Sequence, residues 1–248
     1  MKSLPKGFRG AAIAAGLKSS GALDLTIIEN TGPRFNAAAV YTSNKVVAAP
    51  VIWSREVTKG KLVRAAVLNS GGANACTGPQ GFADTHHTAE KVADLLGISS
   101  GEIVVCSTGL IGELLPMPKI FAGLESIATV LKSDSLDDVS RAIMTTDSVP
   151  KVATVSISGV EFVGIAKGAG MLAPALATML SVVMTDAVLP ENAQEIFSRV
   201  ADRTYNRIDS DGCTSTNDTV LLMGSGASSV SLSDVEFESA LMEVCGSL

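Results

Sequence analysis

The 248-residue sequence has few of the side chains that most often carry enzyme chemistry, with two histidines, four cysteines and one tryptophan. His86 and His87 are adjacent, so on a helix their side chains point about 100° apart and cannot bind one metal ion together. We expect both on the solvent side of a helix and predict no metal site. The scarcity of histidine also makes a Ser-His-Asp arrangement difficult to assemble.

The sequence also has no close cysteine pair and no long apolar run. Its cysteines (Cys76, Cys106, Cys213 and Cys245) are dispersed, which predicts reduced, buried thiols in a cytoplasmic protein. No stretch of about 18 uninterrupted apolar residues is present, so we predict no transmembrane helix and no membrane partner. The short apolar segment 11–17 contains Gly16 and is a weak candidate for a signal peptide.

Basic residues are too few for a nucleic-acid-binding protein. The chain has 19 Lys and Arg against 25 Asp and Glu, a net charge of −6, and no dense basic run. This balance argues against a nucleic acid or an anionic membrane as partner. The remaining composition, 46% hydrophobic with 23 glycines, is typical of a compact enzyme. The length allows one large α/β unit or two smaller domains.

Short segments rich in Val, Ile and Thr alternate with segments of helical periodicity. The sequence predicts eight strands, at 25–29, 38–42, 62–68, 102–106, 151–157, 161–166, 180–185 and 219–223. It predicts five helices, at 81–96, 117–131, 136–144, 191–205 and from a capping box at Ser233-Asp-Val-Glu236 to about 244. Because strands and helices interleave without a strict βαβ rhythm, we predict a layered α/β sandwich. The last helix ends without an element to pack over it, which suggests a fragment of a longer sequence.

Three turns rich in glycine and threonine follow predicted strands. They are Asn69-Ser-Gly-Gly-Ala-Asn-Ala-Cys-Thr77, Cys106-Ser-Thr-Gly109 and Lys167-Gly-Ala-Gly-Met171. Such turns place backbone N–H groups next to ligands, although each is also compatible with an ordinary tight turn.

The third turn supports two exclusive hypotheses. Gly168-Ala-Gly170-Met-Leu-Ala173 matches the G-x-G-x-x-A dinucleotide fingerprint, and Asp186 ends the next predicted strand. This would make the protein an oxidoreductase, but residues 161–186 are too few for a strand, a crossover helix and a second strand.

The second hypothesis concerns Thr178, which precedes the predicted strand 180–185. If the Ala177–Thr178 bond were cut, the freed α-amine, with a pKa near 7.7–8.0, could act as base for the hydroxyl of the same residue. Thr178 would then be an N-terminal nucleophile that needs no histidine. A threonine before a strand is also commonly just a strand residue.

Residues 167–180 and Thr185-Asp-Ala187 resemble the self-cleavage segment of the ornithine acetyltransferase family, also called the bifunctional glutamate N-acetyltransferase/amino-acid acetyltransferase family of arginine biosynthesis. Further motifs agree in the same order: Gly7-Phe-Arg, Gly16-Leu-Lys-Ser-Ser-Gly-Ala-Leu-Asp24, Asn69-Ser-Gly-Gly-Ala-Asn-Ala-Cys-Thr-Gly78, Cys106-Ser-Thr-Gly-Leu-Ile-Gly112, Ala142-Ile-Met-Thr-Thr-Asp147 and Thr214-Ser-Thr-Asn-Asp-Thr219. The resemblance runs along essentially the whole chain and is greatest to actinobacterial members.

The resemblance implies a precursor of the N-terminal-nucleophile type, cut between Ala177 and Thr178 into an α chain (1–177) and a β chain (178–248). Thr178 would carry acetyl from N-acetylornithine to glutamate, without metal or bound cofactor, and acetyl-CoA is a possible co-substrate. Thr108 and Gly109 match the oxyanion-hole pair of the family, and Thr145 and Lys167 match substrate-binding positions. The implied assembly is an α2β2 heterotetramer. Family members continue well past the position of Leu248, so a truncated, non-catalytic fragment is the alternative.

Overall fold

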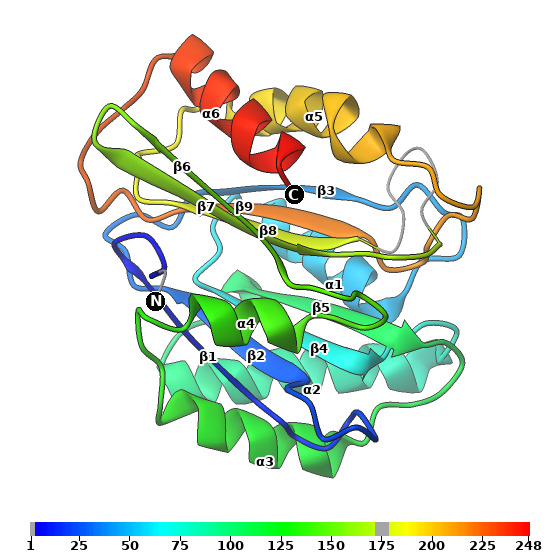
Figure 1. Ribbon diagram of the computed structural model, residues 1–248. Helices are drawn as coiled ribbons and strands as arrows, with labels where there is room; N and C mark the ends of the chain where they lie inside the picture. The colour runs from blue at the N-terminus through cyan, green and yellow to red at the C-terminus, as the bar shows by residue number, and fades with distance from the viewer. Residues whose placement is uncertain (1–2, 172–178) are drawn as a thin grey trace.

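Two β-sheets lie face to face, and helices cover their outer faces (Figure 1). The computed structural model describes residues 3–171 and 179–248. From one side to the other, the layers are a helix pair, the first sheet, the second sheet and a second helix pair. The chain therefore folds as a four-layer sandwich, in agreement with the layered architecture predicted from the sequence.

The first sheet has the strand order β1-β2-β4-β5. Its members are β1 (Phe8–Ile13), β2 (Leu25–Asn30), β4 (Ala65–Gly72) and β5 (Ile103–Leu110). Strands β4 and β5 are parallel, and the other two pairs are antiparallel. Helices α2 (Gly78–Leu96) and α3 (Met117–Ala128) cover its outer face. Helix α2 ends at Gly97, which has a φ of +66°, as expected for a left-handed C-cap.

The second sheet has the order β3-β9-β8-β7-β6. It contains β3 (Ala37–Tyr41), β6 (Lys151–Ile157), β7 (Val160–Lys167), β8 (Leu180–Thr185) and β9 (Thr219–Gly224). Helices α5 (Ala193–Arg203) and α6 (Asp234–Gly246) cover it, and the predicted capping box of Ser233 and Glu236 begins α6. Strands β8 and β9, which follow residue 178, lie between β3 and β7, which precede it, so the segments 1–177 and 178–248 share one core.

Three apolar layers hold the sandwich together because alternate side chains of each strand face opposite ways. In β8, Val182 and Met184 pack between the two sheets, whereas Val183 packs under the helices. Phe162 and Phe237 meet in that helix-covered layer with ring centroids 5.7 Å apart. Helix α4 (Leu136–Ala142) closes one side of the space between the sheets with Leu136 and Val139.

Helix α1 (Ala49–Thr58) lies along the free edge of β5. Its Ser54 hydroxyl donates to the Val105 carbonyl over 2.8 Å and accepts from the Val105 N–H over 3.0 Å. The Trp53 indole N–H donates to the Ile103 carbonyl over 3.0 Å. Two side chains of α1 therefore form the hydrogen bonds to the β5 backbone that a further strand would otherwise form.

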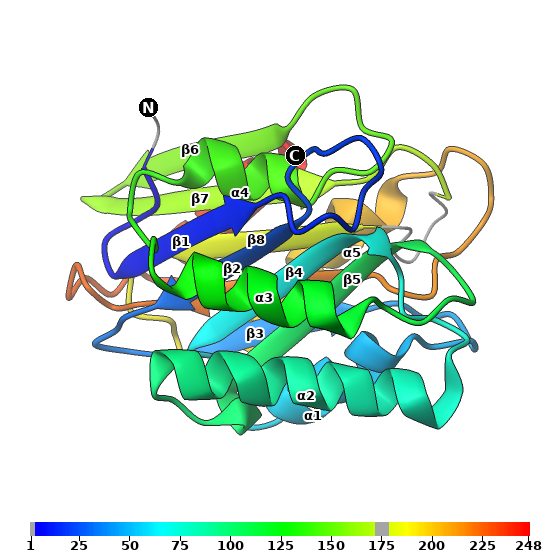
Figure 2. The same ribbon diagram turned by 90° about the horizontal axis from the view of Figure 1, so that it is seen from below.

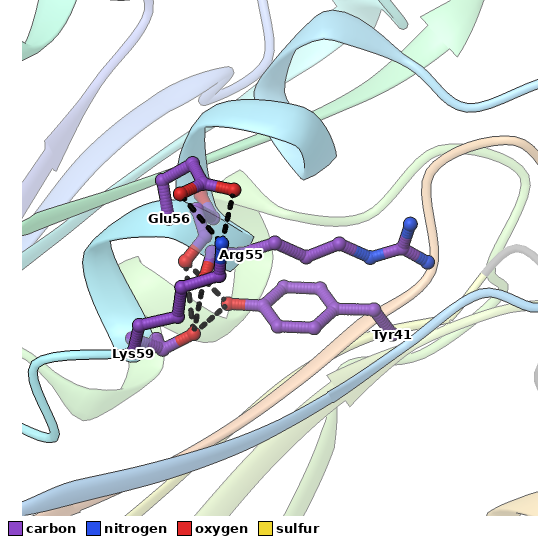
Figure 3. Close-up of polar contacts among 6 residues, drawn as sticks. Tyr41, Arg55, Glu56 and Lys59 are labelled. Atoms are coloured by element: carbon purple, nitrogen blue, oxygen red, sulfur yellow. Dashed lines mark hydrogen bonds and ion pairs between the residues drawn. The ribbon is translucent and has the colours of Figure 1, made fainter.

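The same helix is fastened to the edge strand β3 of the second sheet. The Tyr41 hydroxyl reaches the carbonyl of Ser54 (2.9 Å) and the hydroxyl of Thr58 (3.0 Å), and Arg55 lies over the Tyr41 ring (Figure 3). Further along β3, the Gln194 side-chain amide accepts from the Ala39 N–H and donates to the Ala39 carbonyl, each over 3.0 Å. The edge of β3 at Ala39 is thus paired by a side chain.

The structure corrects some sequence predictions. Strand β1 and helix α1 were not predicted, while the eight predicted strands and five predicted helices are present with boundaries shifted by a few residues. Of the four cysteines predicted to be buried, Cys106 and Cys245 are, but Cys76 and Cys213 are exposed because they lie on loops. His86 and His87 lie on α2, half-buried and exposed respectively.

Candidate active site

Strand ends from both sheets meet at one end of the sandwich. Strands β4 and β5 run side by side to this end, where Ser70 is paired with Thr108 (Figure 2). In the second sheet, Lys167 at the end of β7 is paired with Leu180 at the start of β8, and Leu180 is paired with Thr219 at the start of β9. Ligand sites in layered α/β proteins commonly form where such strand ends meet.

A buried contact between Lys167 and Thr108 joins the two sheets at this end. The Lys167 ammonium donates to the Thr108 hydroxyl oxygen over 3.0 Å, and the two residues are 0% and 2% exposed. Burial lowers the pKa of Lys167 to about 8, although the charges of Asp147 and Asp218 oppose this effect. Thus the sequence motifs that predicted Thr108 and Lys167 as site residues, 59 positions apart, meet in space.

Gly109 lies beside Thr108 at the boundary with solvent. Its φ of +132° is one that side-chain-bearing residues rarely adopt, and a Cβ placed there would lie 2.5 Å from the Gly71 carbonyl carbon. Two of the predicted glycine turns are therefore packed against each other, backbone to backbone. Glycine at this position allows the close approach of β4 and β5 where the site begins.

Asp147 connects the Thr145 turn to the end of β7. Its carboxylate accepts from the Thr145 N–H (3.2 Å) and from the Gly168 N–H (2.8 Å), and it forms an ion pair with Lys151. These donors lower the pKa of Asp147 despite its partial burial. Thr145 itself is exposed and lines a 260 Å³ pocket with Lys18 and Arg141. Thr145 is thus near Lys167 in the fold, although the sequence analysis assigned no role to the aspartate that joins them.

Two further polar residues of the site, Asn217 and Asp218, also had no assigned role. The Asn217 amide donates to the Ala73 carbonyl (2.6 Å) and to the Ser107 carbonyl (2.9 Å) on the first sheet. The Asp218 carboxyl accepts from the Met179 N–H over 2.8 Å and is 0% exposed. Their signal in the sequence was the run Thr216-Asn-Asp-Thr219 directly before a buried strand.

The predicted cleavage site, Ala177–Thr178, lies outside the described residues. Met179, the next residue along the chain, is buried, and its N–H is held by Asp218. In residues 3–171 and 179–248, no group of three potential metal ligands comes together, and no helix is long and apolar enough to cross a bilayer.

The dinucleotide alternative is wrong. A dinucleotide fingerprint lies between parallel strands joined by a crossover helix, whereas β7 and β8 are adjacent and antiparallel. The Gly168 N–H is moreover used by Asp147. Asp186, which that hypothesis placed at the end of the next strand, lies beyond the far end of β8 and accepts from the Glu161 N–H over 2.8 Å.

Comparison with known proteins identifies the family. The model of the ArgJ family matches residues 9–248. The chain belongs to the ArgJ family. It is 56% identical over 244 residues to the arginine biosynthesis bifunctional protein ArgJ of Streptomyces coelicolor, and 51% identical over 253 residues to that of Mycobacterium tuberculosis. These alignments cover 98% of this chain but 64% and 63% of the two relatives, so the ArgJ-family chain spans less than two thirds of their length.

Solved structures agree with this family and with the fold. A chain of ornithine acetyltransferase from Mycobacterium tuberculosis, solved with ornithine, is 46% identical with a TM-score of 0.63, and the match covers 71% of this chain and 94% of that chain. The ArgJ protein of Bacillus halodurans gives 34% identity, a TM-score of 0.63 and coverages of 72% and 95%. The l-aminopeptidase d-ala-esterase/amidase of Ochrobactrum anthropi, a variant of the Ntn hydrolase fold, is 12% identical with a TM-score of 0.55 over 99% of this chain. This last likeness shows the fold alone and confirms the predicted sandwich.

Proposed function

We propose that this ArgJ-family chain belongs to an acetyltransferase that moves acetyl from N-acetylornithine to glutamate through an ester on Thr178. The observation that carries this proposal is the buried Lys167–Thr108 contact beside the segment that leads into β8. Membership of a family whose relatives are named for arginine biosynthesis supports it, as does the ornithine-bound state of the Mycobacterium tuberculosis enzyme.

The proposed reaction begins with self-cleavage. The Thr178 hydroxyl oxygen bonds to the Ala177 carbonyl carbon, the carbon–nitrogen bond breaks, and the nitrogen takes up the hydroxyl proton. Water then hydrolyses the ester, which frees the Ala177 carboxylate and restores the Thr178 hydroxyl. The new α-amine lies on the same residue as the hydroxyl and supplies the base that this histidine-poor chain otherwise lacks.

Turnover repeats the same chemistry on substrates. The Thr178 hydroxyl oxygen attacks the acetyl carbon of N-acetylornithine, and ornithine leaves with the proton on its amine. The glutamate amine then takes the acetyl group and returns the proton to the threonine. Acetyl-CoA could supply acetyl in the first half of this cycle as a co-substrate.

The described contacts suit the assigned roles. A hydroxyl carries one proton, so when the Thr108 oxygen accepts from Lys167 its own proton remains available for a developing oxyanion. Gly109 would contribute its backbone N–H beside it. The Lys167 ammonium and Thr145 would bind the amino-acid substrate, because a cation in a desolvated cleft favours a carboxylate.

Chain lengths support cleavage near residue 177. The ornithine acetyltransferase match covers 71% of the 248 residues, or about 176, and uses 94% of the solved chain. The relatives matched as whole sequences instead align with 98% of this chain. A solved chain of about this length is what an α chain of residues 1–177 would give. We propose that the α and β chains stay together because they share the second sheet, and that they pair into an α2β2 assembly.

Intact mass spectrometry of the purified 248-residue chain tests this function. We expect two fragments that sum to the whole chain plus one water, and one uncut chain for Thr178→Ala. Thr178→Ser should still be cut, because a hydroxyl persists. Incubation with N-acetylornithine should add one acetyl group to the fragment that begins at Thr178. A folded wild-type chain that stays whole would contradict the proposal and leave the non-catalytic fragment as the interpretation.

A further inference from the structure

Strand β6 forms a sheet edge that the rest of the described chain leaves open. The edge of β1 is paired at Gly10 with Lys132, and side chains of α1 and of Gln194 bind the edges of β5 and β3. By contrast, β6 is the last strand of the second sheet, and β7 is its one paired neighbour among the described strands. It runs along one border of the molecule (Figure 2).

Three residues of β6 turn their backbone groups away from β7. A two-residue turn with φ values of +51° and +83° links the two strands, so the flanking residues Ile157 and Val160 form a hydrogen-bonded pair. Such pairs recur at every second residue, and Val152, Thr154 and Ser156 lie between them. The N–H and C=O groups of these three residues therefore face outward, and no backbone group in residues 3–171 or 179–248 bonds to them there.

This edge also has none of the features that commonly prevent strand pairing. Native proteins protect a free edge with a bulge, a proline or a charged side chain. The register of β6 with β7 has no bulge, and the residues from Val152 to Ile157 include neither proline nor charge. Most of them are β-branched, as strands favour. An edge of this kind is suited to pairing with a further strand.

The outward groups of β6 are complementary to those of a second β6 that runs antiparallel to it. When Thr154 faces the partner's Thr154, Val152 faces the partner's Ser156, and every outward N–H and C=O of both strands is paired. The two five-stranded sheets then continue as one sheet. A twofold axis at Ala153 would instead set Ser156 against the partner's Pro150, which has no N–H. The axis at Thr154 is therefore the favoured one.

Charged side chains at the two ends of β6 fit this register. The Ser158 hydroxyl lies 3.5 Å from the Glu236 carboxylate, so Glu236 lies beside the turn that ends β6. With the axis at Thr154, the partner's Lys151 faces Ile157 at this same end. A positive and a negative side chain thus come to the same place, once at each end of the paired strands.

Exposed apolar side chains lie at the same two ends. Val235 and Val149 are 79% and 60% exposed, the highest values among the large apolar side chains that the structure describes. Val235 precedes Glu236 at the turn end of β6, and Val149 lies two residues before Lys151 at the other end. Antiparallel pairing brings each Val149 to the end of the partner's Val235, so both gain an apolar neighbourhood.

We propose that the edge of β6 is the surface on which two copies of this chain pair, strand against strand, about a twofold axis at Thr154. The proposal goes beyond the proposed function because it names the interface between copies. It needs neither self-cleavage nor catalysis. Thr154 and Ser156 are exposed in the single chain and become cross-strand neighbours in the pair.

The test places charges at the proposed axis. Thr154→Lys sets two ammonium groups opposite each other, and Thr154→Glu sets two carboxylates, whereas a mixture of the two variants sets one of each. Thr154 is exposed, so both side chains can be accommodated without disturbing the core. Thr129→Lys is the matched control, because Thr129 is an exposed residue at the end of α3, on the far side of the other sheet. Thermal melting followed by circular dichroism shows that each variant is folded, and sedimentation equilibrium over a dilution series gives its mass and Kd.

We expect the wild type and Thr129→Lys to have the mass of two copies, twice 25.4 kDa, whether or not each copy is cleaved. Each charged variant at Thr154 should raise the Kd at least about tenfold, and mixing the two should restore association. A wild-type chain that stays single, or an association that the variants leave unchanged or the mixture does not restore, would overturn the interface.

Hydrogen–deuterium exchange of the wild type decides the case if a Thr154 variant does not fold. The N–H groups of Val152, Thr154 and Ser156 should exchange slowly in concentrated solution and faster on dilution, and exchange that is independent of concentration would contradict the pairing. Intact mass of the same samples reports self-cleavage separately. A paired but uncut chain would therefore contradict the proposed function alone, and a cut but unpaired chain would contradict the interface alone.

Discussion

Replacing Lys167 with methionine should increase the stability of the chain at neutral pH. Lys167 is 0% exposed, and burial lowers the pKa of its ammonium from the ordinary 10.5 to about 8. Each pKa unit corresponds to 1.36 kcal/mol, so holding this charge in the folded state costs about 3 kcal/mol at pH 7. Methionine has a similar length and carries no charge, so Lys167→Met should recover much of this free energy.

Because the pKa of Lys167 is lowered in the folded chain, the stability gained by Lys167→Met depends on pH. Between about pH 8 and 10.5 the unfolded chain binds a proton at Lys167 that the folded chain has lost. Stability of the parent therefore rises with pH across this window, and the advantage of Lys167→Met should shrink toward zero. Below about pH 8 the advantage should be at its full value of about 3 kcal/mol.

The assay is urea unfolding followed by the fluorescence of Trp53, the one tryptophan of the chain. Both proteins would carry Thr178→Ala, so that each unfolds as a single chain. Lys59→Met is the matched control, because Lys59 lies at the exposed end of α1, where it pairs with Glu56 (Figure 3). A Lys167→Met advantage that stays constant from about pH 7 to 10, or that equals the control, would refute the argument.

Two further substitutions test the framework of the site. Gly109→Ala would have to adopt a φ of +132° with its Cβ 2.5 Å from the Gly71 carbonyl carbon. We therefore expect the free energy of unfolding, measured in urea, to fall by at least about 1–3 kcal/mol. A wild-type urea midpoint would show that this backbone can relax. Phe162→Ala removes a fully buried ring that packs on Phe237. By the same measurement, the free energy of unfolding should fall by about 3–5 kcal/mol. A loss below about 1 kcal/mol would mean that the neighbouring side chains of the helix-covered layer move in to fill the space.

Local sequence patterns predicted most of the fold because the apolar residues of most helices and strands recur with the spacing typical of that element. The two elements that were missed have compositions that contradict their structure. Strand β1 (Phe8–Ile13) is half alanine and glycine, and helix α1 (Ala49–Thr58) contains β-branched residues typical of strands. Both lie at the border of a sheet, where tertiary contacts, such as those of Ser54 with β5, decide the local structure.

The candidate site was predicted only in part, for a different reason. Thr108 and Lys167 stood out through glycine-rich turns and family resemblance, but their contact joins residues from two sheets and has no local signature. Asp147 and Asp218 lie within two of the motifs that resemble the family, but no role was assigned to either carboxylate. Their importance follows from what they hold, the Gly168 and Met179 N–H groups, and that becomes visible only in three dimensions.

The side-chain pairing along β5 and β3 has a consequence for association. Trp53 and Ser54 on β5, and Gln194 on β3, occupy backbone groups that an extended segment from another molecule would need for strand addition. At these positions, a strand from another molecule therefore cannot pair with the edge of either sheet. A partner that approaches them would meet helices and side chains, and any assembly of whole molecules on these sides must be built from surfaces of that kind.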